Sequence, residues 1–118
     1  MKIYLILMIA ALLLGGCSTS GPMQRGQTTG PAQVLLNQAH AEAQAGALQR
    51  AIALVERAVR IEPRNAYVWH RLAQLQLAAG NRAKAKQFAR RSNQFAGENR
   101  SLKRANHRLI EQIIDTEI

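Results

Sequence analysis

The sequence is poor in cysteine, in aromatic residues and in acidic residues, and each shortage excludes a class of protein. One cysteine among 118 residues excludes a disulfide scaffold or a multi-thiolate metal site within a single chain. Aromatic residues make up 4% of the chain, too few for a surface that stacks nucleic-acid bases. Seven acidic residues face sixteen Lys and Arg, so the formal net charge is +9. We therefore expect anionic partners.

Alanine is abundant where other residue types are scarce. Apolar residues make up 47% of the chain, and beyond the N-terminal segment many of them are alanine, the best helix former. The length allows one small domain. The composition therefore predicts an all-α fold.

The N-terminal residues 1–16 have the organisation of a secretory signal peptide. Lys2 supplies a positive charge, and the unbroken apolar run from Ile3 to Leu14 is too short to span a bilayer comfortably. The sequence Leu14-Gly15-Gly16-Cys17 resembles a bacterial lipobox. This resemblance implies cleavage before Cys17, acylation of its thiol and, with Ser18 following, an anchor in the outer membrane facing the periplasm.

A polar segment separates this leader from the folded part. Residues 17–31 are rich in glycine, proline and hydroxyl side chains and have no apolar periodicity. We expect the lipidated cysteine and a flexible tether over 17–31, followed by one folded domain over 32–118.

The folded domain contains an internal repeat with a period of 34 residues. Small residues recur at this offset, and the period resembles that of the tetratricopeptide repeat, a helix-turn-helix unit. The resemblance implies two repeats, 32–65 and 66–99, with a capping helix over 100–118, which together form a short α-solenoid. The matching pairs are Leu35 with Trp69, Ala39 with Ala73, Gly46 with Gly80, and Ala51 with Ala85.

Local signals agree with this division. Gly46 and Gly80 are typical helix terminators, and Asn65 and Asn99 are suited to cap the helices that follow them. Because two repeats alone rarely form a stable stack, the last helix must cover the second repeat. The predicted helices are 32–44, 47–60, 66–79, 82–95 and 100–115.

The last predicted helix has an unusually wide apolar side. Leu102, Leu109 and Ile113 form one stripe. A second set, Ile110, Ile114 and Ile118, widens it. Two interpretations stay open: a broad side facing the core, or an edge on which a partner or a second copy docks.

No catalytic motif is present in the sequence. It contains neither a G-x-S-x-G turn nor a glycine-rich phosphate loop, and acylation would consume its only thiol. His40 and His70 are expected to face a shared groove, but neither they nor His107 have further ligands suitably placed for a metal. We predict a non-enzyme without a cofactor.

The repeat register predicts a concave surface suited to a peptide segment or a helix. Tetratricopeptide domains of the chaperone type hold a C-terminal carboxylate with Lys, Asn and Arg. At the corresponding positions this chain has Leu36, His40 and Arg71, so most of that clamp is missing. An ordinary solvated helix surface is the alternative. The expected concave residues are Gln33, Leu36, His40, Tyr67, His70, Arg71, Gln74 and Leu77.

Basic residues are concentrated between Arg82 and Arg108, where Glu98 is the only acid. For an exported lipoprotein the available anions are lipid phosphates, cell-wall carboxylates and acidic protein faces, and nucleic acid is not an expected partner. A face that only keeps the protein soluble is the alternative. The basic residues are Arg82, Lys84, Lys86, Arg90, Arg91, Arg100, Lys103, Arg104 and Arg108.

Three short segments carry a closer resemblance: Trp69-His70-Arg71-Leu72-Ala73, Arg90-Arg91-Ser92-Asn93, and Asn106-x-Arg108-Leu109-Ile110. They resemble small proteobacterial repeat lipoproteins, among them the Pseudomonas-type outer-membrane activators of class A penicillin-binding proteins. That resemblance implies a protein that docks on a peptidoglycan synthase and favours its active state. A pilotin-like assembly factor for a secretin or pilus, and a structural protein bound to the anionic cell wall, are the other functions left open. The expected partner-binding residues are Leu36, His40, Tyr67, His70, Arg71, Gln74, Arg104 and Arg108.

Overall fold

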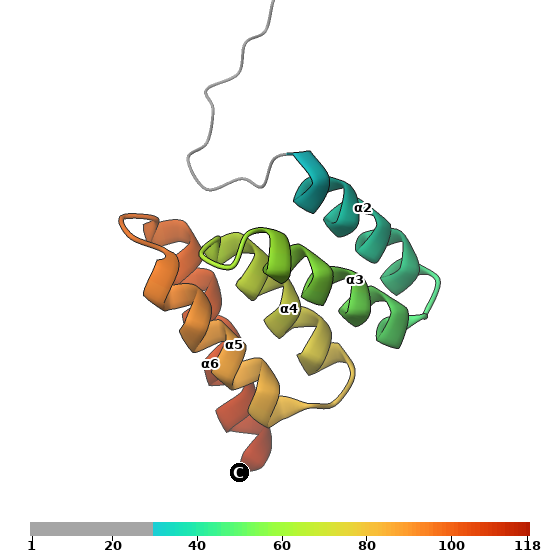
Figure 1. Cartoon of the computed structure of the whole chain (residues 1–118). Coiled ribbons are helices and arrows are strands. Elements are labelled where there is room, and N and C mark those ends of the chain that lie inside the picture. Colours follow the sequence, from blue (N-terminus) through green and yellow to red (C-terminus); the bar gives the residue numbers. More distant parts are fainter. Residues whose placement is uncertain (1–29) are drawn as a thin grey trace, which may run out of the picture.

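The computed structural model describes residues 30–118, and its secondary structure is helical throughout this range. Successive helices lie antiparallel and side by side (Figure 1). The all-α prediction is confirmed, and each predicted helix end lies within two residues of the observed one. The predicted signal peptide, Cys17 and nearly all of the tether lie outside the described residues. The helices are α2 (Gly30–Gln44), α3 (Leu48–Ile61), α4 (Ala66–Ala78), α5 (Arg82–Phe95) and α6 (Arg100–Glu117).

Two glycines end the first helix of each repeat, as predicted. Gly46 has φ +80° and Gly80 has φ +82°, in the left-handed region that favours glycine. The next amide folds back in each turn: Ala47 N donates to Glu42 O at 2.8 Å, and Asn81 N donates to Gln76 O at 2.8 Å. These bonds satisfy carbonyls at the helix ends and start the return helix at once.

Two asparagines cap helices, also as predicted. Asn65 Oδ1 accepts a hydrogen bond from Tyr67 N at 2.9 Å, and Asn99 Oδ1 accepts one from Leu102 N at 3.0 Å. Each cap satisfies an amide that has no partner within its helix and is worth about 1 kcal/mol. The caps therefore fix where α4 and α6 begin.

Helix α2 begins at Gly30, two residues earlier than predicted. Pro31 explains the difference, because its fixed φ suits the first turn of a helix. Its missing N–H would have had no partner there in any case. A proline assigned to the tether is thus part of the first helical turn.

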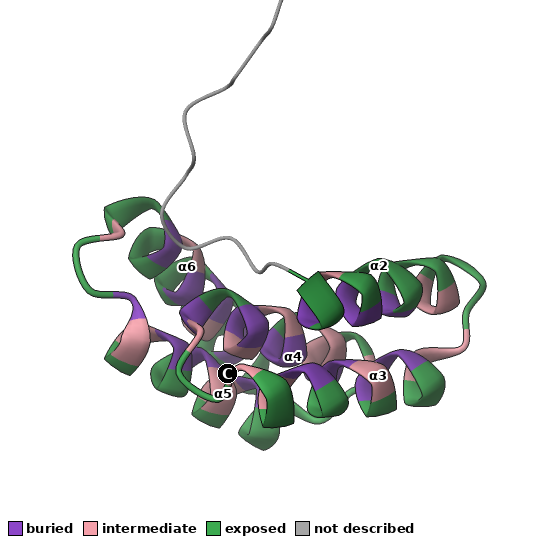
Figure 2. Ribbon diagram, turned by 45° about the horizontal axis from the view of Figure 1, so that its top comes forward, coloured by how far each residue is buried: buried purple, intermediate pink, exposed green. Residues whose placement is uncertain are grey.

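The core depends on small residues between closely packed helices. Ala39, Ala51, Ala73 and Ala85 are at most 2% exposed, as the repeat pattern predicted. Buried residues lie on the facing sides of neighbouring helices (Figure 2). One apolar cluster joins α2, α3 and α4, and a second joins α4, α5 and α6. Helix α6 therefore closes the exposed end of the second repeat.

The wide apolar side of α6 is divided between core and surface. Leu102, Leu109 and Ile113 are buried, and half-buried Ile110 packs against the second cluster. Ile114 is 40% exposed and Ile118 is fully exposed. The broad core face therefore includes Ile110 and Ile113, whereas Ile114 and Ile118 face solvent.

Candidate functional site

Helix α4 presents three of the predicted partner-binding residues on one side. Tyr67, Arg71 and Gln74 follow one another at the spacing of successive helical turns, so they share a face. Tyr67 is 40% exposed, Gln74 is exposed and Arg71 is half-buried. This face lies away from the apolar clusters and is available to a partner.

Arg71 joins this face to α2. Its Nη1 donates to Gln74 Oε1 at 3.0 Å, and its Nη2 lies 3.5 Å from Nδ1 of His40. Since a guanidinium only donates, Nδ1 of His40 can only be the acceptor in this contact. The contact brings three of the predicted partner-binding residues together, His40, Arg71 and Gln74.

His70 occupies a different position from the one expected for it. It is 7% exposed, and its Nδ1 lies 2.7 Å from Asn106 Oδ1 of α6. The expected groove shared by His40 and His70 does not form, because α6 packs over His70 and Arg71 takes the contact with His40. Leu36 is likewise in the core, with 5% of its surface exposed. Both residues can act on a partner only by supporting the surface.

Asn106 is the centre of a buried polar network that links α4, α5 and α6. Its Nδ2 donates to Ser92 Oγ at 2.7 Å and to Asn93 Oδ1 at 2.9 Å. Ser92 Oγ donates in turn to the carbonyl of Ala66 at 2.7 Å. Both hydrogens of the Asn106 amide are used, so its oxygen faces His70, and the proton between them is on His70 Nδ1. Among residues 30–118 no buried side-chain nitrogen or oxygen lacks a partner.

Burial and nearby cations keep His70 neutral. Burial is the main cause that lowers the pKa of His70 below its usual value of 6.5. The hydrogen bond to Asn106 acts in the opposite direction, while the charges of Arg71 and Arg108 lower the pKa further. Arg71 of α4 and Arg108 of α6 therefore both act on the charge of His70, one from each helix of this pair.

Arg104 and Arg108 extend this surface along α6, and both are exposed. The ion pairs within residues 30–118 are Arg50 with Glu42, at 3.3 Å, and His107 with Glu111, at 3.1 Å. Neither Arg104 nor Arg108 is therefore neutralised by a carboxylate of the described chain. The surface of α2, α4 and α6 is polar, with its cations available to an acidic partner. We call it the inner surface; its exposed or half-buried residues are His40, Tyr67, Arg71, Gln74, Arg104 and Arg108.

Asn106 was not among the residues predicted from the sequence to form or support the site. A signal was present, because Asn106 interrupts the stripe of Leu102, Leu109 and Ile113 at helical spacing. A polar residue in a buried stripe must find hydrogen-bond partners. The missing information was the identity of those partners, which come from two other helices.

No group of three His, Cys, Asp or Glu side chains within residues 30–118 lies close enough to hold a metal ion. None of the helices there combines the length and the apolar character needed to cross a membrane.

Comparisons with known proteins identify the fold. The tetratricopeptide repeat family matches residues 42–105. Among solved structures, the chain is similar to the globular C-terminal domain of P. aeruginosa LpoP, with 38% identity and a TM-score of 0.74. This match covers 77% of the present chain and 86% of the other. The comparison with curated proteins finds no match. Both matches point to a protein-binding scaffold, and the chain belongs to the tetratricopeptide repeat family.

Proposed function

We propose that this protein is a non-catalytic envelope lipoprotein that binds a class A penicillin-binding protein and stimulates peptidoglycan synthesis. The observation that carries the proposal is the convergence of the three segments on which the sequence resemblance rests. His70 from the first, Ser92 and Asn93 from the second, and Asn106 from the third are joined by hydrogen bonds. The 38% identity to the LpoP domain of a Pseudomonas species supports the same assignment.

The inner surface is the proposed docking site. Its α4 and α6 residues lie directly around the buried network, so the network holds their backbones in a fixed relation. His40, Tyr67, Arg71, Gln74, Arg104 and Arg108 contact the partner in this proposal, and Leu36 and His70 support them from below. A fixed surface loses little conformational freedom on binding, which favours affinity.

Stimulation requires the surface to prefer one state of the synthase. A ligand shifts an equilibrium only by its difference in affinity for the two states. A tenfold preference for the active state corresponds to about 1.4 kcal/mol, which a few charge-assisted hydrogen bonds from Arg71, Arg104 and Arg108 can supply.

The proposal includes an anchor at Cys17 in the outer membrane, facing the periplasm. Several acyl chains on one cysteine would make the anchoring stable, where a single chain would be marginal. The tether over 17–31 has a contour length of roughly 45–50 Å. The partner must therefore extend from the inner membrane to meet the repeat domain near the outer one.

The test is a glycan-polymerisation assay with a candidate class A synthase and the mature chain. We expect the rate to rise on addition of the wild-type protein, and the Tyr67→Ala/Arg71→Ala variant to lose most of that stimulation. The Arg60→Ala variant is the control, because Arg60 is an exposed cation of α3 outside the inner surface. An unchanged rate with every candidate synthase would contradict the proposal. Capture of a secretin, or of wall fragments alone, from solubilised envelopes would support the other two functions.

A further inference from the structure

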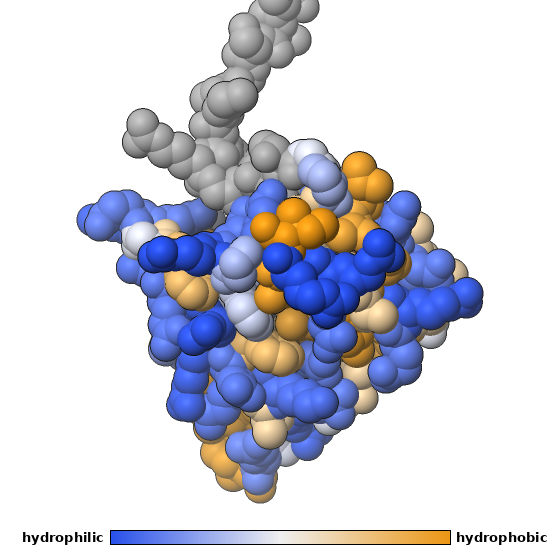
Figure 3. Space-filling model, viewed as in Figure 1, coloured by the Kyte–Doolittle hydropathy of each residue, from blue (hydrophilic) through white to orange (hydrophobic). Residues whose placement is uncertain are grey.

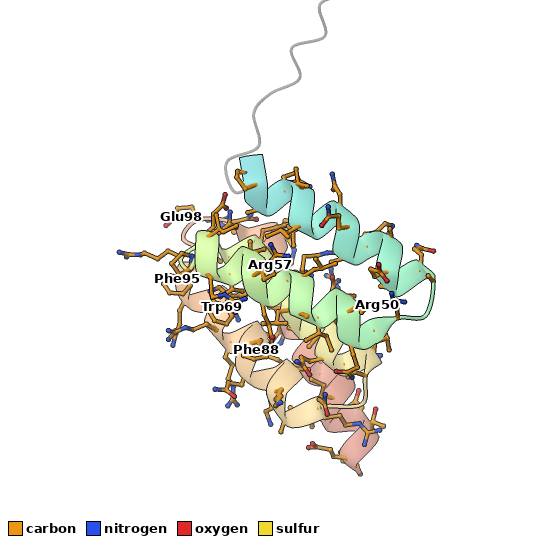
Figure 4. The ribbon with its side chains drawn as sticks, turned by 45° about the vertical axis from the view of Figure 1, so that its right-hand side comes forward. Arg50, Arg57, Trp69, Phe88, Phe95 and Glu98 are labelled. Carbon is orange, nitrogen blue, oxygen red and sulfur yellow. The ribbon has the colours of Figure 1, made fainter. Side chains whose placement is uncertain are left out.

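A groove lies on the side of the second repeat that faces away from the inner surface. Trp69 is two residues beyond Tyr67 and therefore points to roughly the opposite side of α4. There it lines an open groove of about 690 Å³, together with residues of α5 that include Phe88 and Arg91. In Figure 4, Trp69, Phe88 and Phe95 lie near one another beside α3. We call this hollow the outer groove.

Aromatic rings form the apolar part of the outer groove. The ring centroids of Trp69 and Phe88 are 5.7 Å apart, with an interplanar angle of 38°. The indole N–H of Trp69 donates to the carbonyl of Pro63 at 2.8 Å. This bond satisfies the only polar atom of the indole ring. The part of Trp69 that lines the groove is therefore apolar and suits an apolar group of a ligand.

Arg91 is held between two of these rings. Its guanidinium carbon lies 5.6 Å from the centroid of Trp69 and 5.5 Å from that of Phe95. The guanidinium carries five N–H donors, and one of them donates to Gln94 Oε1 at 3.3 Å. The two rings and Gln94 keep Arg91 beside the groove, and its remaining N–H groups can donate to a planar anion such as a carboxylate.

The charge of the outer groove is not balanced within the described chain. Lys86, Arg90 and Arg91 line it, against the single carboxylate of Glu117. None of these cations belongs to either ion pair found within residues 30–118. In the space-filling view, hydrophilic side chains cover most of this face and apolar atoms emerge between them (Figure 3). An anionic ligand with an apolar portion would match both features.

We propose that the outer groove binds an acidic peptide segment of a partner protein. An apolar side chain of the segment packs on Trp69 and Phe88, and a neighbouring carboxylate accepts hydrogen bonds from Arg91. The shape favours a peptide over a membrane surface. Trp69 and Phe88 are half-buried and line a hollow, whereas insertion into lipid needs apolar groups that project outward. This site uses none of the inner-surface residues and goes beyond the proposed function.

Trp69 is the only tryptophan in the chain, so its fluorescence reports on the outer groove directly. The probe is a soluble peptide of alternating Glu and Leu residues, titrated into the mature protein. We expect a saturable change in Trp69 emission that weakens as salt is added. The Arg91→Gln variant should bind the peptide about tenfold more weakly, as expected for the loss of a charge-assisted hydrogen bond. The double variant Lys86→Gln/Arg90→Gln, which leaves the aromatic contacts in place, should also bind it more weakly.

Matched controls separate this site from general charge and from the inner surface. Lys103→Gln removes an exposed cation of α6 outside the groove and should leave peptide binding unchanged, as should Tyr67→Ala/Arg71→Ala. Far-ultraviolet circular dichroism verifies that each variant folds. Equal binding of a Gln/Leu peptide, or undiminished binding by both groove variants, would overturn the proposal. So would an emission change with phosphatidylglycerol vesicles but none with the acidic peptide, because that result would identify a lipid site.

Discussion

His70 Nδ1 donates a hydrogen bond to Asn106 Oδ1 over 2.7 Å, joining two residues that are 36 positions apart in the chain. The bond connects the first helix of the second repeat to the capping helix, and both side chains are buried. A capping helix held by apolar contacts alone could shift along its neighbour. This bond, with those from Asn106 to Ser92 and Asn93, fixes the position of α6.

Replacing Asn106 should therefore destabilise the fold strongly. Asn106→Leu leaves the buried His70 Nδ1 and the half-buried Asn93 Oδ1 without their partner. A buried polar group without a partner costs about 1–3 kcal/mol. We expect the free energy of unfolding in urea to fall by about 2–5 kcal/mol. Asn37→Leu, an exposed site on α2, should change it by less than about 0.5 kcal/mol. Equal stability of Asn106→Leu and wild type would show that the network is dispensable.

Acidification should destabilise the protein through His70. Its pKa is lowered in the folded state, mainly by burial, so below pH 6.5 the unfolded chain binds more protons than the folded one. The stability that the neutral His70 contributes is therefore complete above pH 6.5. It is lost as the pH falls from 6.5 towards the lowered pKa of His70. We expect a lower melting temperature at pH 5 than at pH 7.5.

The test compares how much the melting temperature of each variant changes between pH 7.5 and pH 5. His70→Gln removes the titrating group, so its melting temperature should change less between the two pH values than that of the wild type. Asn37→Leu, which leaves every titrating group in place, should show the same change in melting temperature with pH as the wild type. If the melting temperature of His70→Gln changed with pH as much as that of the wild type, the pH dependence would come from other groups.

The helices could be predicted from sequence because their signals are local. The repeated Gly46 and Gly80 require a backbone conformation that other residues rarely adopt, and Asn65 and Asn99 act within three residues of their own positions. Such features can be recognised without knowing how the helices pack. The small alanines that recur in both repeats also predicted one feature of the tertiary structure, the close approach of neighbouring helices.

The candidate sites were less predictable because they depend on contacts between helices. The repeat register placed His70 correctly on an inner helix, but the packing of α6 decides whether that position is open or covered. In the same way, Arg91 was identified only as part of a basic stretch. Its position between Trp69 and Phe95 depends on how α4 and α5 meet.

Gly80 offers a test of the turn without interference from packing. A Cβ added there would meet no atom within 4 Å, so the cost of Gly80→Ala comes from φ +82° alone. We expect a loss of about 1 kcal/mol in unfolding free energy. Gly80→Asn should cost less, since asparagine tolerates the left-handed region better than alanine does. Equal losses for the two variants would contradict backbone strain as the cause.

Adjacent isoleucines on α6 test how its wide apolar side is divided. Ile113 is 1% exposed and packs in the cluster with Ala73 and Ala85, whereas Ile114 is 40% exposed. Ile113→Ala should cost about 2–4 kcal/mol, because it removes buried methyl groups and leaves a cavity. Ile114→Ala should cost less, about 1 kcal/mol, because truncating a side chain that is open to solvent leaves no enclosed cavity. Urea unfolding of both variants measures the difference. A large loss for Ile114→Ala that depended on protein concentration would show instead that this edge is covered by a second copy of the chain.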